Sequence, residues 1–453
     1  MKIFSIEKGF MKKIITYGTF DLLHNGHINI LKRAKALGDY LVVGVTSEDY
    51  DYNRGKLNVS QSLMERIENV KKTGYADEII VEEYFGQKVG DIQKHNIDTF
   101  VIGSDWLGKF DYLKEYCEVI YLDRTKGVSS TDLRNEKNKI LKMGIVGNGR
   151  IAGRFVAEAR YVSGITIESV FGRTESRVKD FANKFELSSS YTDYSKFLDS
   201  VDAVYIATPH KTHYDYAKKA ILAKKHVLCE KPMVLSEAEA VELFKLAEEN
   251  NVILQEAIKT AYAPAFNKLV NIAKSGIIGQ IKDISATFTK LISDKNLREF
   301  DKSMGGGSFT ELGTYPLCPI IKLLGTDYKD VHFNSIWDKE TGVDLYTKIN
   351  IEYDSAMATA TVGIGVKKEG DLVVAGTKGY IWVPAPWWKT EYFELRFEDL
   401  SKAQKVFVKF DGDGLRYELS EFLHAINNGA SSYKFNPNES IAIARIIEKF
   451  LNK

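Results

Sequence analysis

The sequence predicts an α/β protein in three parts: two successive units on parallel sheets, then an α+β unit with a mostly antiparallel open sheet. Three observations support this prediction. A chain of 453 residues is too long for one ordinary core. Short β-branched runs alternate with amphipathic segments over residues 12–260. From about residue 261 longer strands follow one another with few helices between them.

The composition favours a globular protein whose ligands are small molecules and not polymers. Hydrophobic residues make up 44 % and charged residues 27 %, and the formal net charge is +1. Because no overall field attracts polyanions, we expect neither a nucleic acid nor a membrane as partner. Cys117, Cys229 and Cys318 are too widely spaced for a zinc cluster or a disulfide framework. The N-terminus lacks the apolar stretch of a secretory signal, so we expect a cytoplasmic protein.

The first unit is predicted over residues 12–134. Segments with apolar residues at i, i+3 and i+4 separate the runs that we expect to be strands, which are residues 12–18, 40–45, 78–83, 99–103 and 118–122. Residues 135–142 (NEKNKILK) are mostly charged and are predicted to be a linker.

The second unit is predicted over residues 143–260 and the third over 261–453. Expected strands of the second unit are 143–146, 165–172, 203–208, 226–230 and 252–257. In the third unit they are 282–291, 347–354, 357–365 and 393–399. Helical periodicity returns over residues 415–452.

Two histidines follow the first predicted strand. That strand ends at Gly18, and a helix beginning near Gly26 would place His24 and His27 at its N-terminus. Free N–H groups and the positive end of the helix dipole attract phosphate there. Histidines in this position can donate hydrogen bonds to a nucleotide's phosphates while charge builds up on them. The alternative is a pair of surface histidines that cap the helix.

The stretch TFDLLHNGH, from Thr19 to His27, resembles the nucleotidyltransferases with the HxGH signature, specifically the glycerol-3-phosphate cytidylyltransferase branch. The resemblance extends over residues 12–134 and includes RTKGVSSTDLR at 124–134. It implies that His24 and His27 contact the triphosphate of CTP, with Gly26 letting the backbone approach. The other residues implied at the nucleotide site are Gly18, Thr19, Phe20, Asp105 and a second phosphate cradle of Arg124, Ser129, Ser130 and Thr131.

Lys56 and Arg66 are candidates to neutralise charge in the transition state. A solvated basic loop is the alternative for Lys56, because residues 49–66 depart from the family pattern, and a helix-surface arginine is the alternative for Arg66. The implied reaction is attack by a phosphate monoester on the α-phosphorus of CTP, with Mg²⁺ on the nucleotide. Positioning and charge neutralisation suffice, because the acceptor phosphate is itself the nucleophile.

A second glycine-rich turn directly follows the apolar strand at residues 143–146. Gly147, Asn148, Gly149, Arg150 and Ile151 begin a GxGxxA pattern that ends at residue 152 and opens a helix. This is the Rossmann dinucleotide fingerprint in its required context: the glycines permit a tight turn and close approach of a diphosphate. We therefore predict that these residues bind NAD or NADP.

The residues after the next strand favour NADP. An acidic residue that would hold the ribose 2′-hydroxyl of NAD is missing at that position, where Arg173 and Thr174 stand instead. Arg173, with Thr174 or Arg177, can accept a 2′-phosphate. Glu168 lies earlier in the strand and is a less suitable ribose ligand.

The motifs ATPH (207–210), EKP (230–232), GGG (305–307) and ELGTYP (311–316) resemble the glucose-fructose oxidoreductase, inositol dehydrogenase and MocA family over residues 140–453. The resemblance implies that Lys231 lies beside the nicotinamide and the substrate. It also implies that Tyr315, four residues after Glu311, is the proton donor, with its pKa lowered by Lys231. Glu311 replaces the commoner Asp, which leaves its role open. The alternatives are a solvated lysine and a core tyrosine.

Further residues are expected around this second site. His210 and His213 are predicted to border the cofactor cleft, with a core or surface role as the alternative, and Lys259 and Tyr262 are candidates for lining the substrate pocket. Trp387 and Trp388 are expected to pack. The other predicted cofactor contacts are Thr208, Pro209 and Glu230.

Together the motifs predict a bifunctional enzyme that makes a CDP-activated polyol. We expect the C-terminal part to reduce a small keto or aldehyde compound with NAD(P)H and the N-terminal part to join a polyol phosphate to CMP from CTP. The alternatives are oxidation of a sugar derivative of the same pathway and a nucleotide-sensing module without turnover. By resemblance alone, we expect a homo-oligomer.

Overall fold

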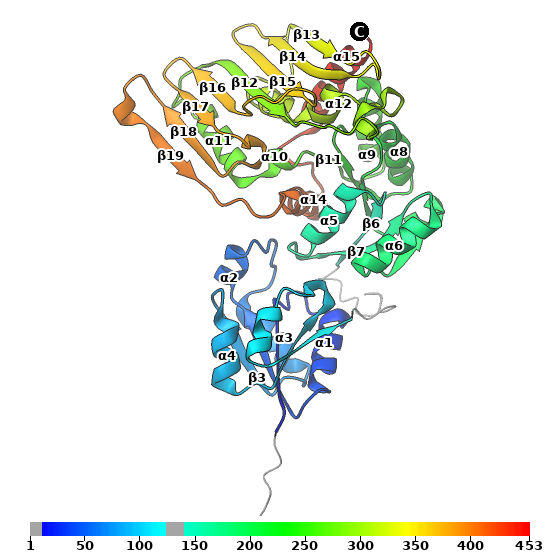
Figure 1. Ribbon diagram of the computed structural model, residues 1–453, viewed down its shortest axis with the longest axis vertical. Coiled ribbons are helices and arrows are strands. Elements are labelled where there is room, and N and C mark those ends of the chain that lie inside the picture. Colours follow the sequence, from blue (N-terminus) through cyan, green and yellow to red (C-terminus); the bar gives the residue numbers. More distant parts are fainter. Residues whose placement is uncertain (1–10, 124–139) are drawn as a thin grey trace, which may run out of the picture. The chain divides into compact units, whose positions relative to one another are not determined.

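The computed structural model describes residues 11–123 and 140–453. The chain divides into two compact units, the first formed mainly by residues up to Leu141 and the second mainly by residues from Lys142 onward (Figure 1).

The first unit is built on a five-stranded parallel sheet. Its strand order is β3-β2-β1-β4-β5, so the chain moves outward from β1 first to one side and then to the other. Every pairing in this sheet is parallel. The strands are β1 (Lys13–Gly18), β2 (Tyr40–Thr46), β3 (Glu78–Glu82), β4 (Thr99–Gly103) and β5 (Glu118–Leu122).

Helices connect these parallel strands, as crossover connections require. Ser62 caps one of them in a capping box with Glu65, which satisfies two backbone N–H groups at the helix start. Two apolar clusters, one containing Ile14 and Val43 and the other Ile15 and Phe100, form the core. The helices are α1 (Asn25–Lys35), α2 (Glu48–Asn53), α3 (Leu63–Lys72) and α4 (Gln87–His95), with 3-10 helices η1 (Ser104–Trp106) and η2 (Asp111–Glu115).

The second unit begins with a six-stranded sheet in the order β11-β10-β9-β6-β7-β8. The β10–β11, β9–β10, β6–β9 and β7–β8 pairings are parallel. The strands are β6 (Leu141–Val146), β7 (Ile165–Phe171), β8 (Ser189–Tyr191), β9 (Ala203–Ile206), β10 (His226–Glu230) and β11 (Leu254–Ala257). The helices between them are α5 (Arg150–Ala159), α6 (Glu175–Phe185), α7 (Tyr194–Asp199), η4 (His210–Thr212), α8 (His213–Leu222) and α9 (Glu237–Glu249).

An eight-stranded sheet follows in the order β13-β14-β15-β12-β16-β17-β18-β19. Among these described strands the β12–β15 pairing is parallel and the other six pairings are antiparallel. Buried and exposed residues alternate along β14, as expected for a sheet with one covered face. The strands are β12 (Ile281–Thr289), β13 (Asp330–Trp337), β14 (Asp344–Glu352), β15 (Met357–Gly363), β16 (Leu372–Gly376), β17 (Tyr380–Val383), β18 (Tyr392–Arg396) and β19 (Gln404–Phe407).

Helices α12 and α13 pack against strands of this sheet, α14 packs against α5, and α15 packs against α9. These contacts join the two sheets of the second unit into one body (Figure 1). The elements are α10 (Lys259–Tyr262), α11 (Pro264–Lys274), η5 (Arg298–Phe300), η6 (Lys302–Met304), α12 (Ser308–Leu312), α13 (Thr314–Leu324), η7 (Trp387–Lys389), η8 (Leu400–Lys402), α14 (Leu415–Asn428) and α15 (Pro437–Leu451).

The predicted fold class is confirmed: two parallel sheets precede a mostly antiparallel one. Details differ from the expectation. The C-terminal helical segment is two helices, because Gly429 adopts a left-handed conformation with φ of 64° and ends α14. Five strands were not predicted, namely β8, β13, β16, β17 and β19. No helix in the described part of the chain is long and apolar enough to cross a membrane.

A buried aspartate fixes the start of α12, the helix that carries Glu311. Asp344 accepts hydrogen bonds from the Ser308 hydroxyl and from the Phe309 N–H group. Gly307 has a φ of 122°, and a Cβ there would lie 2.2 Å from the Asp344 carboxylate. The glycine run therefore allows the chain to pass close to Asp344, and α12 packs against β14 and β15.

The turn after β6 yields a stability prediction. Gly147 has a φ of 105°, and a Cβ there would lie 2.6 Å from the Ala207 carbonyl oxygen, whereas a Cβ at Gly149 would meet nothing within 4 Å. Gly147→Ala should lower the unfolding free energy of the second unit by about 2 kcal/mol. Scanning calorimetry without cofactor should show a loss of about 4 °C in its Tm. The matched variant Gly149→Ala should shift it little, and equal shifts would contradict the steric explanation.

Candidate active sites

His24 and His27 lie at the N-terminus of α1, the end of a helix that can bind phosphate. Helix α1 starts one residue before the predicted position, and His24 is its N-cap, with Nδ1 accepting a hydrogen bond of 3.1 Å from the Gly26 N–H group. The two imidazole rings stack with centroids 3.9 Å apart. The structure therefore brings together the predicted pair at the helix N-terminus.

Glycine is required at position 26 for a reason beyond backbone access. A Cβ on Gly26 would lie 2.8 Å from Cε1 of His24, so a side chain there would push the histidine ring away. The preceding turn is also strained, because Phe20 has a φ of 52°. The centroid of the buried Phe20 ring lies 5.5 Å from that of His27, in an edge-to-face contact. A Cβ on Gly18 would lie 2.9 Å from Cζ of the Phe20 ring.

His27 is held neutral. Burial, followed by the charges of His24 and Lys56, holds the pKa of His27 well below its usual value. Its Nδ1 is buried and has no hydrogen-bond partner among the described residues. A neutral imidazole still donates one hydrogen bond, so His27 can serve a phosphate as a donor. The charge of Lys56 reaches His27, although the Lys56 ammonium donates a hydrogen bond of 2.6 Å to the Arg160 backbone oxygen.

Asp51 organises the cationic side of this site. Its fully buried carboxylate accepts hydrogen bonds from Thr46 at 2.7 Å and Thr19 at 3.1 Å. Arg54 binds it at 2.6 Å and Arg66 approaches it at 3.4 Å. Sequence analysis did not single out Asp51, because its partners come from several separate elements.

Arg66 is buried and does not lie on a helix surface. Its side chain is 0 % exposed and donates to the backbone oxygens of Thr19 at 2.9 Å and Thr46 at 2.8 Å. Its Nη2 is buried without a hydrogen-bond partner among the described residues. Arg66 therefore braces the turn that follows β1, and one of its nitrogens retains the capacity to bind an anion.

A buried lysine at this edge of the sheet also escaped sequence analysis. Lys88 pairs with Glu82 at the end of β3, and its Nζ lies 4.4 Å from the ring centroid of Tyr17. Burial lowers the pKa of Lys88 despite Glu82, and the charge of Arg54 acts in the same direction. The charge of Arg54 therefore reaches Lys88 from another element, although no local motif marks either residue.

The remaining predicted nucleotide contacts divide into two groups. Asp105 is exposed in η1, immediately after β4, and so lies at the carboxyl edge of the first sheet. The predicted second phosphate cradle, Arg124, Ser129, Ser130 and Thr131, lies outside the described residues.

The dinucleotide turn of the second unit has the geometry that a diphosphate needs. Gly147 is packed against the Ala207 carbonyl, while Gly149 and Arg150 are exposed at the start of α5. Asn148 and Ile151 are half-buried beside them. Because a Cβ at Gly149 meets nothing, the space in front of the helix N-terminus is open, and the turn fits a nicotinamide dinucleotide.

The predicted 2′-phosphate residues gather at the end of β7. Arg173 and Thr174 follow that strand, Arg177 lies in the first turn of α6, and all three are exposed. The Thr174 carbonyl accepts the Val178 N–H group at 3.1 Å, which places Thr174 at the helix start. Two guanidinium groups at one helix N-terminus are suited to binding a phosphate.

His213 supports the cofactor-side turn from within the core. It is fully buried, and its two ring nitrogens lie 2.9 Å from the Pro232 carbonyl oxygen and 2.8 Å from that of Thr208. Burial lowers its pKa, and a neutral ring donates only one of these bonds at a time. His213 thus connects the turn of Thr208 and Pro209 to the EKP segment, with no ring nitrogen left over for a cofactor.

His210, Lys231 and Arg298 surround Glu311. His210 is buried, and its Nε2 lies 3.8 Å from a Glu311 carboxylate oxygen. The Arg298 guanidinium lies 3.1 Å from the other oxygen, and the Lys231 Nζ donates to the Glu311 backbone oxygen at 2.9 Å. Burial raises the pKa of Glu311 although these cations oppose it. Glu311 thus holds Lys231 and α12 together.

Lys231 and Tyr315 are close, as predicted: the ammonium lies 5.4 Å from the phenol ring centroid. The expected lowering of the Tyr315 pKa is wrong. Burial, followed by the carboxylates of Glu230 and Glu418, raises the pKa of Tyr315 above its usual value. The phenol therefore stays protonated, which suits a proton donor.

Sequence analysis missed Glu418, which the structure places among these groups. Its carboxylate is fully buried on α14, and neither oxygen has a hydrogen-bond partner among the described residues. Burial raises its pKa well above the usual value. Glu230 accepts a hydrogen bond from the Tyr205 hydroxyl at the end of β10.

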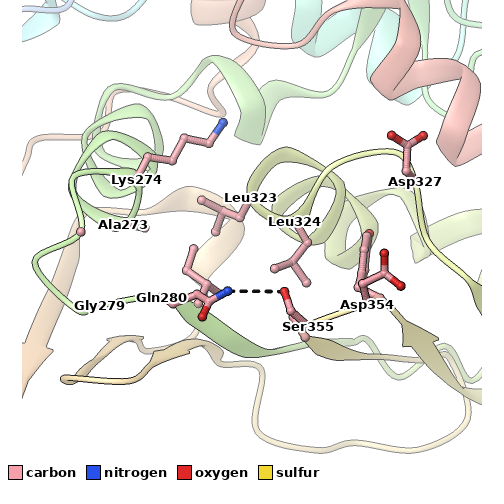
Figure 2. A pocket seen from close by; sticks show the side chains of 13 residues that line it. Ala273, Lys274, Gly279, Gln280, Leu323, Leu324, Asp327, Asp354 and Ser355 are labelled. Carbon is pink, nitrogen blue, oxygen red and sulfur yellow. Dashed lines mark hydrogen bonds between the residues drawn. The ribbon is translucent and has the colours of Figure 1, made fainter.

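A surface hollow lies elsewhere in the second unit. Its volume is about 430 Å³, and it is formed by the end of α11, the start of β12 and the turn between β14 and β15 (Figure 2). Gln280 and Ser355 meet across it at 3.5 Å. None of the residues that line it is a predicted catalytic or cofactor residue, so the hollow has no part in either site.

Family models match most of the described chain. A cytidylyltransferase-like model matches residues 15–136. The oxidoreductase family model with an NAD-binding Rossmann fold matches 141–258, and the GFO/IDH/MocA C-terminal domain model matches 266–382.

Curated relatives divide in the same way. The glycerol-3-phosphate cytidylyltransferase of Bacillus subtilis is 52 % identical over 126 residues, which are 28 % of this chain and 97 % of that protein. The scyllo-inositol 2-dehydrogenase (NADP(+)) IolU of Bacillus subtilis is 27 % identical over 328 residues, which are 68 % of this chain and 96 % of the relative. A trans-1,2-dihydrobenzene-1,2-diol dehydrogenase of Sus scrofa is 29 % identical over 323 residues, which are 68 % of this chain and 95 % of the relative.

The solved structures with a similar fold include KijD10, a 3-ketoreductase from Actinomadura kijaniata in complex with NADP and TDP-benzene. The TM-score is 0.61 at 22 % sequence identity, and the match covers 68 % of this chain and 96 % of the KijD10 chain. This likeness shows the fold of the second unit. With the histidine pair, the dinucleotide turn and the Lys231–Tyr315 pair in place, the chain is a fusion of a member of the glycerol-3-phosphate cytidylyltransferase-like nucleotidyltransferases with an NAD(P)-dependent oxidoreductase of the Gfo/Idh/MocA family.

Proposed function

We propose that this chain makes a CDP-activated polyol in two steps. The second unit reduces a small keto or aldehyde compound, and the first unit transfers CMP from CTP to the polyol phosphate and releases pyrophosphate. The observation that carries the proposal is the stacked His24–His27 pair at the N-terminus of α1, in a unit 52 % identical to a glycerol-3-phosphate cytidylyltransferase.

In the first unit a phosphate oxygen of the acceptor attacks the α-phosphorus of CTP. A new P–O bond forms while the bond from the α-phosphorus to the bridging oxygen breaks, and pyrophosphate leaves. His24 and His27 donate hydrogen bonds to the phosphates, and Lys56 and Arg66 offset the developing charge. The chain needs no nucleophile of its own.

The acceptor phosphate would bind through cations at the carboxyl edge of the first sheet. Lys88 and Arg54 are candidates there, and they are ion-paired with Glu82 and Asp51 respectively. An arriving phosphate would share these cations with the two carboxylates.

In the second unit Tyr315 gives its proton to the substrate oxygen, and Lys231 stabilises the negative charge that develops on that oxygen. A bound nicotinamide supplies the hydride. Arg173 and Arg177 favour the form with a 2′-phosphate. Of the relatives, IolU is an NADP(+) dehydrogenase and KijD10 was solved in complex with NADP. We therefore propose NADP as the preferred cofactor over NAD.

The order of the two steps can be measured directly. The purified chain, CTP, Mg²⁺ and a keto-phosphate such as dihydroxyacetone phosphate should release pyrophosphate only after NADPH is consumed. Glycerol 3-phosphate, which is already reduced, should give pyrophosphate without NADPH and serves as the control. Equal pyrophosphate release from the keto-phosphate with and without NADPH would contradict the coupling.

Loss of one histidine should separate the two activities. His27→Ala removes a phosphate donor at the start of α1 and should lower kcat for pyrophosphate release about 100-fold. Reduction by the second unit of the same sample should be unchanged, which shows that the chain is intact. His332→Ala, which alters an exposed histidine on β13, is the matched control and should leave both rates unchanged.

The raised pKa of Tyr315 predicts the pH dependence of reduction. A proton donor works below its pKa and fails as the pH rises through it, so a raised pKa moves the alkaline fall in kcat to higher pH. Wild-type kcat should therefore not fall before about pH 10. Tyr315→Phe should lower kcat about 100-fold. Unchanged hydride transfer in this variant would instead favour a nucleotide-sensing module.

A further inference from the structure

Lys259 is a half-buried lysine of the second unit that forms no ion pair with any described carboxylate. Burial lowers its pKa, and the neighbouring Lys389 ammonium lowers it further. Holding an ammonium group away from water without a counter-charge is unfavourable. Proteins tolerate such groups where a ligand supplies the missing charge.

Three cations from separate elements approach a single carboxylate beside Lys259. Lys389 of η7 lies 2.7 Å from an oxygen of Asp413, and Arg154 of α5 lies 3.8 Å from the other oxygen. The charges of Lys259, Lys389 and Arg154 all help to lower the pKa of Asp413. Local positive charge therefore exceeds what Asp413 can neutralise.

This cluster is distinct from the turn that would hold the cofactor diphosphate. Arg154 and Glu158 are four residues apart, so they lie on the same face of α5. Glu158 forms a two-pronged ion pair with Arg416 of α14, at 2.9 and 2.8 Å. The Arg154 face of α5 is therefore turned toward α14, whereas the glycine turn lies at the end of the helix.

The cluster lies beside the predicted proton donor. Glu230, Glu418 and Asp413 act on the pKa of Tyr315 and also on that of Lys259, so the phenol and the ammonium share their neighbours. For Lys259, the charges of Glu418, Asp413 and Glu230 oppose the lowering of its pKa, but none of these carboxylates forms an ion pair with it. Glu230 is already engaged by the Tyr205 hydroxyl.

Aromatic side chains connect Tyr315 to the cationic cluster. The Phe288 ring stacks on Trp388 with centroids 3.7 Å apart and meets Tyr315 at 5.0 Å. Trp388 precedes Lys389 in η7, and its carbonyl accepts a hydrogen bond of 2.9 Å from Thr260, the residue after Lys259. The reacting end of a substrate at Tyr315 would therefore have its other end near these cations.

We propose that Lys259, Lys389 and Arg154 bind a phosphate ester carried by the compound on which the second unit acts. This inference rests on the proposed function and adds the class of substrate to it. The phosphate could belong to a free polyol phosphate, acted on before cytidylyl transfer, or to a CDP-linked polyol, acted on afterwards. In both cases the two units recognise the same chemical group.

The test compares a phosphate ester with its uncharged counterpart. The full chain with NADPH should reduce dihydroxyacetone phosphate with a KM roughly tenfold below that for dihydroxyacetone. Lys259→Gln should raise the KM for the ester roughly tenfold, so that the preference for the ester disappears. Lys268→Gln, which alters an exposed lysine on α11, is the matched control. An unchanged preference in Lys259→Gln would overturn the proposal.

A binding measurement separates this proposal from the redox reaction. Calorimetric titration with NADPH present should show that wild type binds glycerol 3-phosphate, or CDP-glycerol, at a second site about tenfold more tightly than Lys259→Gln does. The compound that shows this difference identifies the source of the phosphate. If neither carbonyl compound is reduced but the difference persists, the reductase assignment fails and the phosphate subsite stands. Equal affinities in the two proteins for both ligands would overturn the subsite.

Discussion

Each unit has a glycine where a parallel strand ends and a helix begins, an arrangement that can bring backbone N–H groups close to a phosphate. In the first unit, Gly26 leaves room for the His24 ring that caps α1. In the second, Gly147 takes a left-handed conformation against the Ala207 carbonyl and leaves Gly149 exposed. The same physical requirement is met by different residues, because one turn must also carry donor side chains and the other must not.

Burial determines the protonation of the groups that surround each site. Burial is the largest cause of the lowered pKa of His27 and of the raised pKa of Tyr315, and nearby charges shift each pKa in the same direction as burial. A neutral imidazole and a protonated phenol can each donate a hydrogen bond, while the positive charge is carried by the lysines and arginines around them.

Short sequence patterns correctly predicted the features that lie within one short segment. The parallel strands, the glycine turns and the Glu311–Tyr315 spacing are each contained in a short segment, and the structure has them where the sequence indicated. Asp51, Lys88 and Glu418 were missed because their roles arise from contacts between distant segments. In a sequence, a charged residue that will be buried cannot be told from one that will be exposed. The strands β16, β17 and β19 are only four or five residues long, which leaves little periodicity to detect.

The two compact units belong to one polypeptide. Translation therefore produces the cytidylyltransferase-like unit and the oxidoreductase unit in equal number at every level of expression. A cell cannot adjust the balance between the two activities by making more of one enzyme than of the other. That balance has to be set by the turnover rates and substrate affinities of the sites themselves.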